Sequence, residues 1–185
     1  MRRLYFHSLL SRAVTEPAPT PDERALAELG ASLRARARAR LGRSLAIREV
    51  DAGSCNGCEL EIHALNNAFY DLERFGIRFV ASPRHADVLL VTGPVTRNMA
   101  FALKRAFDCT PDPKWVVAAG DCACGRGLFA PSYALEGEDG AVARVLPVDL
   151  HIPGCPPTPV DLLRGLLALL EAADGRIPHA ACPTC

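Results

Sequence analysis

Several features that mark common protein classes are missing from this chain of 185 residues. Its formal net charge is zero, so the overall charge gives no reason to expect nucleic-acid binding. No apolar run is long enough to span a membrane, and the longest, over residues 160–173, contains three charged side chains. Aromatic residues make up 6% of the chain and hydrophobic residues 49%. This composition is typical of a globular protein with a buried core.

Disulfide stabilisation and export are not expected either. Eight cysteines are too few for a small disulfide scaffold in a chain of this length. The chain begins with two arginines, but His7, Ser8 and Ser11 interrupt the apolar segment that a signal peptide requires. We therefore expect a cytoplasmic protein, where thiols stay reduced and cysteine clusters more often bind metals.

The charge is distributed unevenly along the chain. Residues 1–43 hold nine arginines and four acidic residues, so the rest of the chain is acidic. A basic arm indicates docking to a partner or peripheral contact with an anionic membrane face, although a solvated helix face explains the same charges equally well. Within it, three prolines over 15–22 predict a linker, and apolar residues at three- and four-residue steps predict a helix over 23–42.

Beyond the arm the sequence alternates between strand and helix patterns. Strands are predicted over 45–50, 77–81, 86–92, 115–119 and 143–150, and helices over 59–73, 97–107 and 159–173. In the first of these helices, the residues predicted to face inward are Leu60, Leu65, Ala68, Phe69 and Leu72. The alternation predicts an α/β fold with a doubly wound parallel sheet. We divide the chain into the arm (1–43), an α/β domain (44–173) and a tail (174–185).

Four cysteines lie in three loops rich in Gly or Pro, each after a predicted strand. Cys55 and Cys58 form a C-x-x-C pair, Cys122 follows Gly-Asp, and Cys155 lies between Pro-Gly and Pro-Pro. Because ligands of doubly wound sheets bind beyond the carboxyl ends of the strands, these loops should meet at one edge.

The residues alone leave four interpretations open. Four thiolates are the usual ligands of an iron–sulfur cluster. A structural zinc is the second, favoured by a further C-x-x-C pair at Cys182 and Cys185. The third is a thioredoxin-like redox pair. The last is a set of small, buried apolar cysteines, which we favour for Cys109 and which also suits Cys124.

Longer motifs around these cysteines carry a resemblance to a known family. They are Gly-Ser-Cys-Asn-Gly-Cys-Glu-Leu-Glu-Ile, Ser-Pro-Arg-His-Ala-Asp-Val-Leu-Leu-Val-Thr-Gly-Pro-Val-Thr-Arg-Asn-Met, Gly-Asp-Cys-Ala and Ile-Pro-Gly-Cys-Pro-Pro-Thr-Pro. In this order they resemble the small subunit shared by [NiFe] hydrogenases and respiratory complex I, the twenty-kilodalton subunit, over about residues 47–172. The resemblance implies a flavodoxin-like fold. It also implies one [4Fe–4S] cluster on Cys55, Cys58, Cys122 and Cys155.

The spacing of the first pair distinguishes two branches of this family. Complex I subunits carry adjacent cysteines there, whereas hydrogenase-type subunits carry C-x-x-C, as this chain does. The resemblance is therefore to the electron-transfer subunit of membrane-associated hydrogenases of the formate hydrogenlyase type. It implies a hydrogenase-like large subunit, a ferredoxin-like subunit and integral-membrane subunits as partners, on the inner face of the cell membrane. A complex I-like module that reduces quinone is the alternative, and a zinc-stabilised interaction protein is the alternative from another class.

This chain departs from the family pattern after the third ligand. The family usually has Gly-Gly a few residues further on, where this chain has Cys124-Gly125-Arg126-Gly127. Arg126 should raise the potential of a nearby cluster, and Cys124 competes with Cys122 as a ligand. For Glu59 and Asp121, beside ligands, we favour solvated or capping carboxylates over a role in proton coupling.

Overall fold

The computed structural model describes residues 23–172. Within them lie the strands β1 (Leu45–Asp51), β2 (Ile77–Phe79), β3 (Val88–Thr92), β4 (Trp115–Ala119) and β5 (Leu150–Ile152). The helices are α2 (Glu23–Leu41), α3 (Gly57–Ala64), α4 (Arg97–Cys109) and α5 (Pro159–Glu171), with short 3-10 helices η1 (Leu72–Phe75), η2 (Pro83–His85) and η3 (Val142–Arg144). Cys182 and Cys185, the further C-x-x-C pair of the zinc interpretation, lie outside the described residues.

The five strands form one parallel sheet in the order β2-β1-β3-β4-β5. This order is that of flavodoxin-like doubly wound folds, so the predicted fold class is confirmed. Every residue of β3 and β4 is buried, as their continuous apolar sequences predicted. The order reverses between β1 and β3, and ligands of such sheets bind beyond the strand ends at this point.

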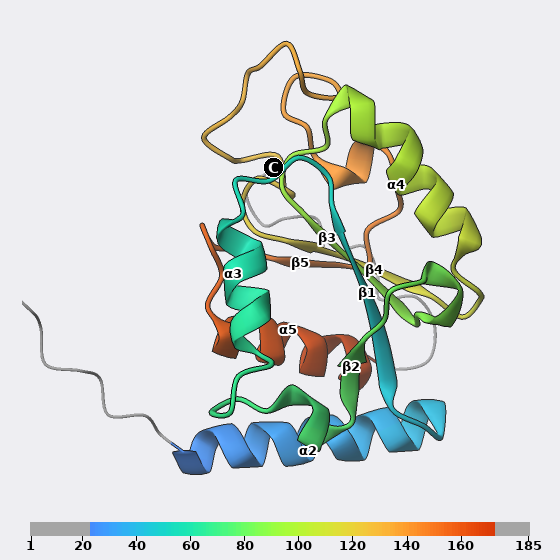
Figure 1. The fold of residues 1–185 in the computed structure, drawn as a ribbon, viewed down its shortest axis with the longest axis vertical. Helices are drawn as coiled ribbons and strands as arrows, with labels where there is room; N and C mark the ends of the chain where they lie inside the picture. The colour runs from blue at the N-terminus through green and yellow to red at the C-terminus, as the bar shows by residue number, and fades with distance from the viewer. Residues whose placement is uncertain (1–22, 173–185) are drawn as a thin grey trace, which may run out of the picture.

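Helices cover both faces of the sheet (Figure 1). On one face, α2, α3 and α5 form a core with the strands that includes Leu33, Ile62 and Leu162. On the other, Leu103 of α4 packs in a second core with residues such as Leu89. The two cores hold the strand ends, and hence the loops that follow them, at fixed positions.

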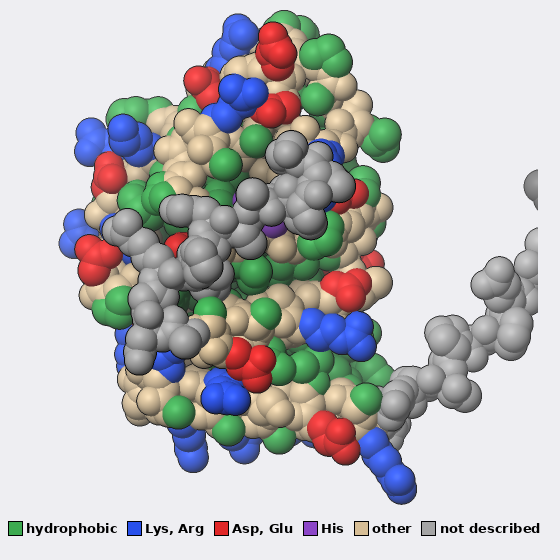
Figure 2. Space-filling model, turned by 180° about the vertical axis from the view of Figure 1, so that it is seen from behind, with side chains coloured by type: hydrophobic (Ala, Val, Ile, Leu, Met, Phe, Trp, Pro, Cys, Tyr) green, Lys and Arg blue, Asp and Glu red, His purple; other side chains and the backbone are tan. Residues whose placement is uncertain are grey.

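Helix α2 runs across the amino-terminal side of the sheet and packs along α5 (Figure 1). The guanidinium of Arg40 lies 5.0 Å from the Trp115 ring and donates to the carbonyls of Leu170 (3.2 Å) and Ala172 (2.6 Å) at the end of α5. Other arginines of α2 are exposed along the lower edge of the molecule (Figure 2). The basic helix therefore has one face in the core and one in solvent.

An ion pair between an exposed arginine and a buried carboxylate joins the segment after α2 to the sheet. The guanidinium of Arg43 donates to both carboxylate oxygens of Asp87, at 3.0 and 2.5 Å. The Asp87 side chain is only 4% exposed, and it also accepts a hydrogen bond from the backbone N–H of Ala46 at 2.9 Å. This carboxylate connects β1 to the start of β3.

Helix α3 is shorter than the helix predicted over 59–73. It ends at Ala64, and the side-chain oxygen of Asn67 then accepts hydrogen bonds from the N–H groups of Phe69 and Tyr70, at 2.9 and 3.0 Å. Such side-chain to backbone bonds offer the chain an alternative to the helix. The chain then continues into η1.

The early end of α3 changes which residues face the core. Leu65 and Leu72 are buried, as predicted. The prediction is wrong for Leu60, which is 61% exposed, and for Phe69, which is 40% exposed, as well as for Ala68. Leu60 lies within α3 and is exposed because the helix buries the face of Glu59 and Ile62 instead. Ala68 and Phe69 lie beyond the end of the helix, where the turn at Asn67 breaks the periodicity.

The strand predicted over 143–150 is also wrong, because this apolar segment contains η3 and β5 begins only at Leu150. Val142 donates its N–H to the carbonyl of Ala123, and Leu146 donates to the carbonyl of Val142. Val142 and Leu146 are buried in the second core, so their apolar character reflects packing from a turn. No helix within residues 23–172 is long and apolar enough to cross a membrane.

Candidate metal centre

The four cysteines lie in the loops after β1, β4 and β5, on the side of the sheet that the sequence predicted. Cys55 follows β1, and Cys58 lies in the first turn of α3. Cys122 follows β4, and Cys155 follows β5. Cys55 and Cys155 are exposed, Cys58 is half-buried and Cys122 is buried. Two thiols therefore lie against the protein and two at its surface.

The pKa values of the two inner thiols, Cys58 and Cys122, are raised above the ordinary value for cysteine. Burial, followed by the charges of Glu59, Cys122, Cys55 and Cys155, raises the pKa of Cys58 to about 12. Burial, followed by the charges of Cys155 and Cys55, also raises the pKa of Cys122. The geometry agrees for Cys58, whose Sγ lies beside Gly120 of the Cys122 loop. Positive charge supplied by bound metal would favour their thiolate forms.

Two glycines leave room for the inner thiols. A Cβ at Gly120, where φ is +92°, would lie 2.6 Å from the Sγ of Cys58. A Cβ at Gly127 would lie 2.3 Å from the Sγ of Cys122. Both positions need glycine because the sulfur atoms occupy the space of a side chain. The contact at Gly127 was not predicted from the sequence, although a glycine is itself a signal for close approach.

The loops of Cys122 and Cys155 are hydrogen-bonded to each other. Gly120 donates its N–H to the carbonyl of Ile152 at 2.8 Å, and Asp121 donates its N–H to the carbonyl of Gly154 at 2.9 Å. The Oδ1 of Asp121 accepts in return from the N–H of Gly154 at 3.0 Å. The two ligand loops are thus joined before any metal is considered.

The carboxylate of Asp51 holds the loop that carries Cys55. The Oδ1 of Asp51, the last residue of β1, accepts from the N–H groups of Gly53 and Ser54, both at 2.7 Å. A Cβ at Gly53, where φ is +132°, would lie 2.4 Å from the side chain of Thr96. This close packing sets the position from which Cys55 leaves the strand.

The four thiols are donors of the type that an iron–sulfur cluster takes. The family's cluster takes four thiolates, and these four thiols share one edge of the sheet with no side chain at Gly120 or Gly127 to block them. The part of the chain described here contains no group of three or more Cys, His, Asp or Glu side chains arranged to hold a single metal ion.

Two further cysteines, Cys124 and Cys109, lie within the described residues. Cys124 is buried, 6% exposed, and two residues from Cys122. The thiols that most affect Cys58 are those of Cys122, Cys55 and Cys155. Cys109, predicted to be buried, is exposed, because it ends α4 at the surface.

The two carboxylates beside ligands differ in their surroundings. Asp121 is bonded to Gly154 as described above, which agrees with a capping carboxylate. Glu59 is only 7% exposed, and neither of its carboxylate oxygens has a hydrogen-bond partner within residues 23–172. The prediction of a solvated or capping carboxylate is therefore wrong for Glu59, because α3 turns it inward in place of Leu60.

A basic side chain lies beside the two joined loops. The guanidinium of Arg126 is 4.0 Å from the Oδ1 of Asp121, and the two residues line a hollow of about 460 Å³ with Pro153 and Gly154. Burial, and then the charge of Arg126, lowers the pKa of His151. The cation that departs from the family pattern is thus placed at the cysteine loops.

Large apolar side chains are exposed in the segments next to the cysteines. Leu60 is two residues from Cys58, and Leu128 and Phe129 follow the Cys122 loop at 90% and 47% exposure. Such side chains indicate a surface that another protein covers.

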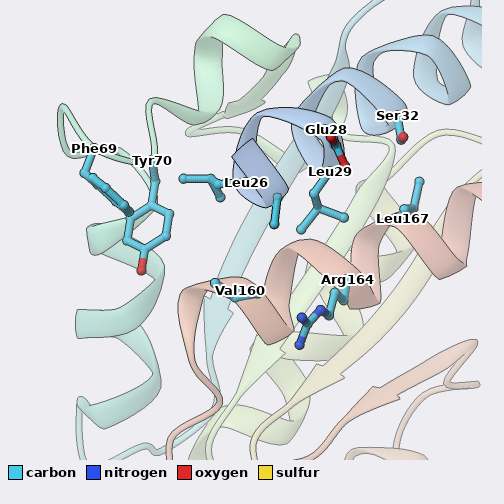
Figure 3. A pocket seen from close by; sticks show the side chains of 10 residues that line it. Leu26, Glu28, Leu29, Ser32, Phe69, Tyr70, Val160, Arg164 and Leu167 are labelled. Atoms are coloured by element: carbon cyan, nitrogen blue, oxygen red, sulfur yellow. The ribbon is translucent and has the colours of Figure 1, made fainter. Parts of the chain in front are cut away.

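A larger apolar hollow lies at a different place, between the start of α2, the turn after α3 and α5 (Figure 3). Its volume is about 610 Å³, and its apolar lining includes Leu26, Leu29, Phe69 and Leu167. No cysteine lines it, so it is separate from the metal centre.

Comparison with known proteins agrees with the motifs. The family described as NADH ubiquinone oxidoreductase, 20 Kd subunit, matches residues 55–169. The "Probable membrane-bound hydrogenase subunit mbhJ" of Pyrococcus furiosus is 47% identical over 131 residues, covering 71% of this chain and 77% of that protein. Formate hydrogenlyase subunit 7 of Escherichia coli is 42% identical over 167 residues, covering 90% of this chain and 62% of that protein.

A solved structure shows a related fold. A chain of the membrane-bound sulfane sulfur reductase, described as an archaeal respiratory membrane complex, aligns with a TM-score of 0.59 and 34% identity. The alignment covers 77% of each chain.

Proposed function

Because the chain belongs to the 20 kDa subunit family of NADH ubiquinone oxidoreductase, we propose that it is the small, electron-transfer subunit of an oxidoreductase complex. The complex would be a membrane-bound [NiFe] hydrogenase of the formate hydrogenlyase type. The chain would carry one [4Fe–4S] cluster on Cys55, Cys58, Cys122 and Cys155. The observation that carries this proposal is the position of the four cysteines in the loops after β1, β4 and β5, with Gly120 of the Cys122 loop directly beside the Sγ of Cys58.

Each part of the site has a separate task in this proposal. The thiolates of Cys58 and Cys122 would bind on the protein side, and those of Cys55 and Cys155 on the exposed side. Gly120 and Gly127 keep the space of the inner sulfur atoms free. Such a cluster supplies a centre that takes up and releases single electrons, with a potential tuned by nearby charges and hydrogen bonds.

The exposed side of the site should be covered by the large subunit. Leu60, Leu128 and Phe129 would be buried in that contact, which would also bring the cluster close to the partner's active site. A ferredoxin-like subunit would deliver the electrons, and integral-membrane subunits would hold the assembly at the inner face of the membrane. The exposed arginines of α2 would contribute to peripheral contact with that face.

The similar proteins belong to complexes that carry out different overall reactions, so they support a role in electron transfer but do not point to a single electron acceptor. The similar proteins include subunits of a hydrogenase and of formate hydrogenlyase, and a chain of a sulfane sulfur reductase. The C-x-x-C spacing of Cys55 and Cys58 favours the hydrogenase branch over a complex I-like module that reduces quinone. The sequence of the partner large subunit decides between them: two C-x-x-C pairs would indicate nickel binding, and their absence would favour quinone or another acceptor.

Ligand substitutions test the proposed cluster directly. Cys155→Ala should abolish the EPR signal of the reduced cluster in the anaerobically purified complex. Cys122→Ala should do the same, whereas Cys124→Ala should leave the signal intact. The reverse result for Cys122 and Cys124 would show that the third ligand is misassigned.

A second pair of substitutions tests the docking surface. Phe129→Ser should reduce co-purification of the large subunit. Phe101→Ser is the matched control, because Phe101 is 68% exposed on α4, outside the cysteine loops. Equal losses for the two variants would contradict the proposed surface.

A further inference from the structure

The carboxylate of Asp121 connects the two loops that carry Cys122 and Cys155. Its Oδ1 accepts a hydrogen bond from the N–H of Gly154, the residue directly before Cys155, at 3.0 Å. The backbone N–H of Asp121 donates to the carbonyl of the same glycine at 2.9 Å. Both polar groups of the Gly154 backbone are therefore bonded to the residue directly before Cys122.

A second set of bonds fixes Asp121 within its own loop. The carbonyl of Asp121 accepts from the N–H of Arg126 at 2.9 Å, and the Arg126 guanidinium lies 4.0 Å from the Asp121 carboxylate. The loop also closes on itself through Cys124, whose N–H donates to the carbonyl of Gly120 at 3.2 Å. The Asp121 side chain thus extends from a closed turn toward the neighbouring loop.

The loop after β5 is the part that needs such support. β5 has only three residues, and Gly154 follows it with φ at +133°, a conformation that glycine alone adopts readily. A short strand followed by a positive φ leaves little regular structure to set the direction of Cys155. The bond from Asp121 fixes the residue from which Cys155 extends.

We infer that Asp121 is a positioning residue, which sets the Cys155 loop against the Cys122 loop so that two ligands from different strands reach the same metal centre. This inference rests on the proposed function and assigns Asp121 no contact with the cluster. Only the acceptor oxygen of Asp121 is needed for this hydrogen bond, so asparagine at position 121 should preserve the loop arrangement and alanine should not.

Hydrogen exchange at the Gly154 amide tests the contact in the full-length chain. In the wild-type chain this amide should exchange slowly. Asp121→Ala should accelerate its exchange about fivefold, the factor expected from losing one hydrogen bond, whereas Asp121→Asn should leave the rate within twofold of wild type. Fast exchange at Gly154 in the wild-type chain would overturn the inference, even if the alanine variant fails to fold.

Iron and acid-labile sulfide content in the anaerobically purified full-length chain tests the consequence. Asp121→Ala should lower both several-fold, and Asp121→Asn should retain them. Asp71→Asn is the matched control, since Asp71 also pairs with an arginine, Arg74 at 3.6 Å, in a segment without cysteines. A wild-type chain without iron would overturn the proposed function. An iron-loaded wild type together with a fully loaded Asp121→Ala variant would overturn the positioning role alone.

Discussion

A methyl group added at Gly120 should displace one ligand and leave the fold in place. The new Cβ would lie 2.6 Å from the Sγ of Cys58, whereas ordinary contacts between such atoms begin at about 3.5 Å. The sulfur would therefore have to move by about 1 Å, roughly twice the error that a functional site tolerates. Gly154 and Pro157 also lie within 4 Å of the new atom, so it has little freedom to move instead.

Backbone strain is the second effect of this substitution, and a control separates it from the first. Gly120 has φ at +92°, so any other residue there costs about 1–2 kcal/mol. Gly42 also has a positive φ, +66°, but a Cβ there would meet nothing within 4 Å. Gly42→Ala therefore imposes comparable backbone strain without touching Cys58.

The two alanine variants should differ in metal content and not in stability. Both should lower the melting temperature by about 2–8 °C, as expected for 1–2 kcal/mol in a chain of this size. Anaerobic purification followed by iron and sulfide analysis should show a loss of several-fold for Gly120→Ala and wild-type content for Gly42→Ala. A fully loaded Gly120→Ala variant would refute the placement of Cys58 against this glycine.

Three further substitutions test the electrostatics of the fold and the site. Arg126→Gln should lower the midpoint potential of the cluster by an amount on the order of tens of millivolts in an EPR-monitored redox titration, because a cation favours the reduced state. Arg144→Gln, which removes an exposed arginine paired with Asp139, should leave the potential unchanged. Asp87→Ala should lower the free energy of unfolding, measured in urea, by about 1–3 kcal/mol, because the buried N–H of Ala46 loses its acceptor. Asp71→Asn, at an exposed ion pair, is the control, and a smaller effect for Asp87→Ala than for this control would contradict the role of Asp87. Burial, and then the charge of Glu59, raises the pKa of Glu49 above 4.5, so the folded state holds this proton more tightly than the unfolded state and stability falls as pH rises through that range. Glu49→Gln should therefore stabilise the protein at pH 7 and not at pH 4, and a larger gain at pH 4 would show that the sign is wrong.

The sequence predicted the fold where local pattern and packing agree. The continuous apolar runs at β3 and β4 identified central parallel strands, and the glycine loops after β1, β4 and β5 placed the cysteines at one edge. Parallel strands with crossover helices follow directly from such alternation. The order of the five strands, by contrast, depends on contacts between segments far apart in the chain.

The errors arose where a local interaction overrode the periodic pattern. The turn at Asn67 follows the early end of α3 and left Phe69 exposed. The apolar side chains of Val142 and Leu146 pack from a turn, so their pattern was mistaken for a strand. Periodicity alone cannot separate these cases from regular elements.

Two contacts of the candidate site were also not predicted from the sequence. The contact between Gly127 and Cys122 and the bond between Asp121 and Gly154 join residues whose relation depends on loop geometry. Gly127 itself was a signal for its contact with Cys122, since a residue without a side chain often marks a close approach. Nothing in the local sequence indicated the second.

Metal and sulfide analysis of the anaerobically purified full-length wild-type chain tests the central claim most directly. The account predicts about four iron atoms and about four acid-labile sulfides for this chain, lost together in Cys155→Ala. Zinc in place of iron, with no sulfide, would contradict it.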